Sequence, residues 1–177
     1  MSKKIVVSFP GGRGYEVPLL YFGSKYFENV GYEKLFINHP ASGDISNEAI
    51  YENVKRVFSE INFAEYEHVV FIGKSLGTYV ACKLKEEYCI PATLILLTPI
   101  EPTLVYIRES NDIRLVATAE NDRHVDAGLV RALCDKERIP CYVEPNVGHR
   151  MEVKGDIRRD LQIVANVLEE IDKKVIR

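Results

Sequence analysis

A serine between two glycines is the residue of this sequence best placed to do chemistry. Gly73, Ser75 and Gly77 form the pattern Gly-x-Ser-x-Gly, directly after the apolar run 69–72 and before an amphipathic segment that starts at Leu76. This context predicts a buried strand, a sharp turn and a helix, with the serine in a strained backbone conformation at the turn. Glycines are needed on both sides because a Cβ there would collide with the neighbouring strand or helix. The turn holds the serine hydroxyl out as a nucleophile.

Two other interpretations of the residues around Ser75 are considered. Ser75 is also suited to be the N-cap of the following helix, because serine is favoured at that position. Gly73-Lys74-Ser75 resembles the end of a phosphate-binding loop, but that loop needs a glycine five residues before Gly73, where His68 stands. The pattern therefore leaves a nucleophilic and a capping serine open, and it predicts no nucleotide site.

Length and composition indicate an ordinary globular protein. The chain has 177 residues, of which 46% are hydrophobic and 28% charged, and its net charge is −3. This length suits a single domain, residues 1–177, and the charge shows no basic excess to attract nucleic acid or an anionic membrane. The first apolar run, Ile5 to Phe9, is too short for a signal peptide and breaks at Pro10, so we expect a cytoplasmic protein. Its oligomeric state is not predicted.

The four cysteines show no Cys-x-x-Cys pairing, and two of them fall in helix-like apolar patterns. We expect reduced core thiols rather than a disulfide framework or a metal site. The four are Cys82, Cys89, Cys134 and Cys141.

Short apolar runs alternate with helical periodicities along the whole chain. Six runs predict buried strands: Ile5 to Phe9, Leu35 to Ile37, Val69 to Ile72, Thr93 to Leu97, Ile113 to Thr118 and Cys141 to Val143. Apolar residues at helical spacing lie between or after them, most clearly Ile157, Leu161, Val164, Leu168 and Ile171. Alternating strands and helices predict an α/β protein with a parallel sheet of about six strands and helices on both faces.

Polar and glycine-rich loops follow three of these strands. They are Pro10-Gly11-Gly12-Arg13-Gly14, Glu120-Asn121-Asp122 and Asn146-Val147-Gly148-His149. Because the carboxyl ends of parallel strands meet at one edge of a sheet, we expect a ligand site where these loops and Ser75 converge.

Ser75, Asp122 and His149 follow successive strands in the order serine, acid, histidine, and in this the chain resembles the α/β-hydrolase superfamily, in particular its small bacterial serine hydrolases. The resemblance covers nearly the whole chain. It implies that Ser75 is the nucleophile, His149 the base and Asp122 the triad acid, with Glu120 the alternative acid. It also implies that the backbone N–H groups of Gly12 and Leu76 form an oxyanion hole.

Other residues of these loops are candidates for binding the substrate. Gly11 and Arg13 lie in the loop after the first strand, where Arg13 is placed to meet an anionic group, and His39 follows the second strand. Lys74, in contrast, is expected to be a solvated charge.

The chain departs from the family pattern at two places. It begins at what resembles the family's third strand, so the first two strands are expected to be absent. Only about fifteen residues separate the runs ending at Leu97 and starting at Ile113, which leaves no room for a cap domain.

We therefore predict a cofactor-independent serine hydrolase acting on a small ester, thioester or related acyl compound. The alternative is a catalytically silent domain of the same fold that serves as a binding or interaction module.

Overall fold

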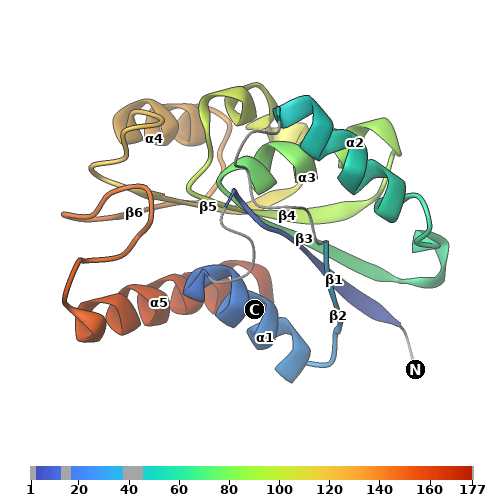
Figure 1. Cartoon of the computed structure of the whole chain (residues 1–177), viewed down its shortest axis with the longest axis horizontal. Helices are drawn as coiled ribbons and strands as arrows, with labels where there is room; N and C mark the ends of the chain where they lie inside the picture. The colour runs from blue at the N-terminus through green and yellow to red at the C-terminus, as the bar shows by residue number, and fades with distance from the viewer. Residues whose placement is uncertain (1–2, 13–16, 38–45, 177) are drawn as a thin grey trace.

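A parallel sheet of six strands forms the centre of the protein, and α-helices cover both of its faces (Figure 1). The computed structural model describes residues 3–12, 17–37 and 46–176. The strands are β1 (Lys4–Phe9), β2 (Glu33–Phe36), β3 (His68–Lys74), β4 (Ala92–Leu97), β5 (Ile113–Ala119) and β6 (Cys141–Glu144). They lie in the order β2-β1-β3-β4-β5-β6, and every neighbouring pair is parallel. The direction of winding therefore reverses between β1 and β3.

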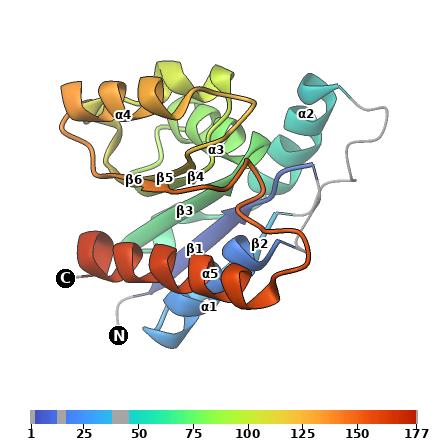
Figure 2. The same ribbon diagram turned by 90° about the vertical axis from the view of Figure 1, so that its left-hand side faces the viewer.

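Five α-helices of the described chain form the two outer layers. They are α1 (Pro18–Asn29), α2 (Asn47–Phe58), α3 (Leu76–Glu87), α4 (Ala127–Lys136) and α5 (Ile157–Ile171). Helices α1 and α5 lie together on one face of the sheet, and α2, α3 and α4 lie on the other (Figures 1 and 2). Because both faces are covered, the central strands carry apolar side chains on each side.

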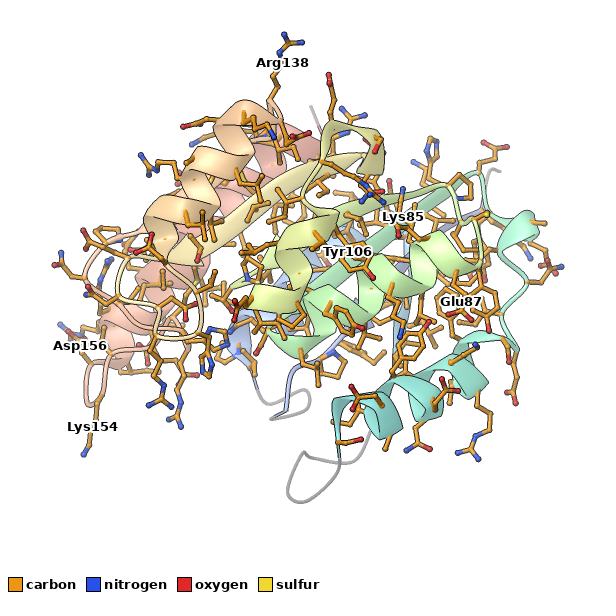
Figure 3. All side chains as sticks on the ribbon, turned by 90° about the horizontal axis from the view of Figure 1, so that it is seen from above. Lys85, Glu87, Tyr106, Arg138, Lys154 and Asp156 are labelled. Carbon is orange, nitrogen blue, oxygen red and sulfur yellow. The ribbon has the colours of Figure 1, made fainter. Side chains whose placement is uncertain are left out.

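Two apolar clusters fill the space between the layers. One joins α2, α3 and α4 to the sheet around Phe9, Phe58 and Phe71, and the other joins α1 and α5 to it around Leu20 and Ile163. Polar contacts add to the packing of the helices. Glu87 at the end of α3 points toward α2 (Figure 3), where it accepts a hydrogen bond from Tyr51.

The six predicted strands are confirmed, with ends that shift by one or two residues. The helical spacing in α5 is also confirmed, but the predicted apolar face is not buried throughout. Ile157 and Leu161 are 68% and 56% exposed, whereas Ile163 and Val167 are buried. The side of α5 that packs on the sheet is centred on Ile163 and Val167, so periodicity alone placed part of the face wrongly.

The chain between β4 and β5 contains two short 3₁₀ helices, η2 (Glu101–Tyr106) and η3 (Glu109–Asn111). Tyr106 of η2 lies over α3 (Figure 3), and its ring is 6.0 Å from that of Tyr79. This segment packs on the domain and forms no lid, as its length predicted. Among the described residues, no helix is both long and apolar enough to cross a membrane.

Candidate active site

Ser75 occupies the turn between β3 and α3 in a strained backbone conformation. Its φ is 55° and its ψ is −123°, a region that residues with a Cβ rarely adopt. The conformation is held on both sides: the Ser75 N–H donates to the carbonyl oxygen of Leu97 at 3.0 Å, and its carbonyl oxygen accepts from the N–H of Thr78 at 2.9 Å. The strained turn predicted from the sequence is confirmed. Ser75 does occupy the N-cap position of α3, but its side chain makes no capping hydrogen bond.

The two glycines of the motif are required by close backbone approach. A Cβ on Gly73 would lie 2.6 Å from the carbonyl oxygen of Gly77, and a Cβ on Gly77 would lie 1.9 Å from the carbonyl oxygen of Phe9. Helix α3 therefore starts directly against the ends of β1 and β3. This packing brings the Gly11-Gly12 loop beside the serine, because a Cβ on Gly11 would be 2.9 Å from the Ser75 Cβ.

The loops that follow β5 and β6 are tied to each other by backbone contacts. The Asn121 N–H donates to the carbonyl oxygen of Val147 at 2.9 Å, and the Asn146 N–H donates to the carboxylate of Glu120 at 2.7 Å. Glu120, the alternative acid, thus has its carboxylate engaged by the backbone of the neighbouring loop. These bonds hold the segments bearing Asp122 and His149 side by side.

Three side chains meet at this edge of the sheet in a hydrogen-bonded series. The Nε2 of His149 lies 2.8 Å from the Oγ of Ser75, and its Nδ1 lies 2.7 Å from the Oδ2 of Asp122. The other carboxylate oxygen, Oδ1, accepts the backbone N–H of His124 at 2.8 Å. The structure therefore brings together the three residues selected from the sequence, with Asp122 rather than Glu120 on the histidine.

The carboxyl group of Asp122 is held in its charged form. Its side chain is fully buried. Burial by itself disfavours the charge, but hydrogen bonds from His149 and from the backbone N–H of His124 outweigh it, and the pKa of Asp122 falls below its ordinary value. A carboxylate on Nδ1 leaves Nε2 of a neutral imidazole without its proton, facing the serine.

Lys74, immediately before the serine, is not a solvated charge as the sequence suggested. The residue is only 4% exposed. Its ammonium donates to the Oγ1 of Thr98 at 2.5 Å and to the carbonyl oxygen of His149 at 2.9 Å. It therefore connects the end of β3 to the loop that carries the histidine. The prediction was wrong because the segment after β4 and the His149 loop lie against the end of β3, where their oxygens accept the ammonium and cover the side chain.

A cleft of about 1020 Å³ opens above the serine. Its walls include Gly11, Gly12 and Leu76, and the N–H of Leu76 belongs to the first turn of α3, where helix N–H groups have no acceptor within the helix. Gly11, one of the three residues predicted to bind substrate, lines the cleft. Arg13 and His39, the other two candidates, lie outside the described residues.

The cleft also contains residues that the sequence did not single out for it. His124 packs against His149 with the ring centroids 4.3 Å apart, and Arg123, Arg150 and Glu152 line the same walls. Burial, followed by the neighbouring His149, lowers the pKa of His124. Their positions next to Asp122 and His149 in the sequence were the one signal that could have placed them here.

The four cysteines are free thiols. Among the described residues, no three His, Cys, Asp or Glu side chains gather in a cluster that could hold a metal ion.

Comparison with known proteins shows likeness in structure without likeness in sequence. No family model matches the chain, and no curated protein matches it significantly. An α/β serine hydrolase homologue from Coxiella burnetii matches with a TM-score of 0.69 at 13% identity, over 97% of this chain and 86% of the other. A serine hydrolase without a lid from Xanthomonas campestris matches with a TM-score of 0.67 at 12% identity, over 98% and 83%.

A protein of unknown function from Agrobacterium tumefaciens, described as an α/β hydrolase, matches with a TM-score of 0.74 at 11% identity, over 98% of this chain and 86% of its own. At such identities the likeness concerns the fold. With its six parallel strands, the chain has the α/β-hydrolase fold, and its short described segment between β4 and β5 forms no lid.

Proposed function

We propose that this protein is a serine hydrolase that cleaves a small ester, thioester or related acyl compound through an acyl-enzyme formed on Ser75. The observation that carries the proposal is the unbroken series of contacts from Ser75 Oγ through the His149 ring to Asp122. It is supported by the strained turn, which presents the hydroxyl to a cleft large enough for a small substrate. The fold itself hosts many functions, so the proposal rests on the site.

The roles follow from the chemistry of each group. His149 takes the proton of the Ser75 hydroxyl as its oxygen attacks the acyl carbon, because a neutral serine is a poor nucleophile. The imidazolium that forms is stabilised by Asp122, and it then gives its proton to the departing alcohol or thiol. A water molecule, deprotonated by His149, next attacks the acyl-enzyme and releases the acid and the free serine. None of these steps requires a metal or an organic cofactor.

The negative oxygen that develops on the acyl group needs hydrogen-bond donors. We assign this role to the backbone N–H groups of Leu76 and Gly12, which border the cleft on the side of β1 and α3. The N-terminus of α3 also favours negative charge at this position. In other enzymes, one such donor contributes about 2.7 to 4 kcal/mol to stabilising the transition state.

Labelling with a fluorophosphonate probe tests the proposal directly. We expect the intact protein to gain the mass of one probe on Ser75 and to hydrolyse 4-nitrophenyl butyrate, and we expect Ser75→Ala to lose both properties. Ser59→Ala is the matched control, because Ser59 is an exposed serine at the end of α2. If the wild type is not labelled and hydrolyses no ester, the protein is a silent binding module. Labelling that survives Ser75→Ala would move the nucleophile elsewhere.

A further inference from the structure

The charges that line the cleft are unevenly distributed. Among the described residues that line it, Arg123 and Arg150 are exposed cations, Lys74 is a buried one, and Glu152 is the one carboxylate. Asp122 is buried behind His149, to which it is paired. The whole chain carries a net charge of −3, so this cleft is a positive region on an acidic protein. A concave site lined by one sign of charge concentrates ligands of the opposite sign.

The two arginines are available to a ligand. Both are exposed, and neither guanidinium is ion-paired with a carboxylate anywhere in the described chain. Other arginines do form such pairs: Arg108 with Glu86, Arg114 with Asp112 and Arg159 with Glu144. A guanidinium presents a planar fork of donors that fits a carboxylate or a phosphate.

The two exposed arginines belong to one side of the reaction centre. Arg123 directly follows Asp122, and Arg150 directly follows His149, so both lie with the acid and base. The uncharged residues of the cleft, among them Gly12, Leu76 and Ile100, lie on the side of β1, α3 and η2. Because His149 must protonate the leaving group, that group departs on the side of the arginines.

We propose that the substrate carries a negative charge, a carboxylate or a phosphate, on the part that leaves as the alcohol or thiol, and that Arg123 and Arg150 bind it. The inference rests on the proposed acyl transfer at Ser75 and names its substrate class. His124 adds little charge near neutral pH, because burial lowers its pKa, and its ring packs against the ring of His149.

The test compares four aryl esters, two anionic and two neutral, in the wild-type protein. Butyryl 4-nitrophenol is neutral, butyryl 3-carboxy-4-nitrophenol carries its anion on the leaving group, and the mono-4-nitrophenyl ester of adipic acid carries it on the acyl group, with the hexanoyl ester as its neutral partner. Each kcat/KM is divided by the rate of the same ester with hydroxide. We expect the leaving-group anion to be favoured about tenfold over its neutral partner at low salt, and the preference to shrink by 0.5 M salt. The acyl-side anion should gain less than about threefold.

Variants locate the origin of the preference. The readout is the ratio of anionic to neutral ester within each variant, so a general loss of activity cancels. Arg150→Gln and Arg123→Gln should each lower the ratio about threefold, and Arg150→Glu should bring it below one. Arg138→Gln is the matched control, because Arg138 lies before β6, at the other end of the strands, and projects from the molecule (Figure 3).

The outcomes distinguish a failure of this inference from a failure of the proposed hydrolase function. Suppose that the neutral ester is hydrolysed and that its hydrolysis depends on Ser75. If the ratio of anionic to neutral ester is then near one, or is unchanged in the arginine variants, the inference is overturned and the proposed hydrolase function stands. A larger gain for the adipate ester overturns the assignment to the leaving group. Absence of hydrolysis of every ester overturns both the function and the inference that depends on it.

Discussion

Replacing Ser75 by glycine should relieve the strain at the turn, and the gain can be worked out from its backbone angles. At φ 55° and ψ −123°, a residue with a Cβ is destabilised by roughly 1–3 kcal/mol. Glycine adopts this region without that penalty, but it loses about 0.5–1 kcal/mol more backbone entropy on folding than alanine does. The difference predicts that Ser75→Gly is more stable than Ser75→Ala by about 0.5–2 kcal/mol. Both variants lack the hydrogen bond to His149, so that loss cancels.

The measurement is the free energy of unfolding in urea, with thermal unfolding as a second readout. For a domain of this size, the expected difference raises the Tm of the glycine variant about 2–6 °C above that of the alanine variant. Ala132→Gly serves as the control for ordinary backbone, because Ala132 is an exposed residue within α4, and there glycine should destabilise by about 1 kcal/mol. Glycine that stabilises relative to alanine at position 75 and destabilises at position 132 would indicate backbone strain at Ser75. An alanine variant as stable as the glycine variant, or more so, would refute the reasoning.

Four further outcomes are expected. Asp122→Asn should lower kcat by about 10⁴-fold with the fold intact, and Glu120→Gln far less; the reverse ranking would move the acid to Glu120. Folding lowers the pKa of Asp122 below its ordinary value of 3.8. The carboxylate therefore contributes fully to the unfolding free energy above pH 3.8, and this contribution is lost as the pH falls through the pKa of the folded state. The wild type's advantage over Asp122→Asn in urea unfolding should therefore shrink between pH 6 and pH 3, and an advantage that grows on acidification would contradict this. Lys74→Met should lower the unfolding free energy by about 1–3 kcal/mol and reduce kcat more than it changes KM, since two oxygens lose their donor; unchanged kcat would show that Lys74 does not position His149. In an aryl ester series, kcat/KM should peak at four acyl carbons or fewer, because a cleft without a lid buries few methylenes at about 0.8 kcal/mol each, and a steady rise to twelve carbons would contradict this.

Much of the site could be predicted from the sequence, because the conformation and position of its residues are set by short segments of the chain. The motif around Ser75 encodes its own turn: the glycines are dictated by contacts that the turn creates with β1 and with the start of α3. The carboxyl ends of parallel strands always share an edge, so Asp122 and His149 were placed near the serine by strand order alone. The N-cap of α4 is likewise local, because the side chain of Asp126 accepts the N–H of Leu129.

Short segments of sequence could not predict the direction of side chains at the ends of strands and helices. Glu120 and Asp122 are two residues apart in one loop, and the carboxylate of Glu120 is engaged by the Asn146 N–H, which comes from the loop after β6. The burial of Lys74 depended on β4 and on the His149 loop lying against it. The exposure of Leu161 depended on which side of α5 packs on the sheet, and that is the side of Ile163 and Val167.

The sequence by itself therefore determined the order of the strands and helices, the strained turn at Ser75 and the set of residues at the reactive edge, since hydrophobic period, glycine sterics and strand direction are properties of short segments. Only the tertiary structure decided which carboxylate meets His149, that a lysine is buried behind it, and that two arginines border one side of the cleft. Those outcomes come from contacts between segments distant in the chain, and their geometry is set by how the layers pack.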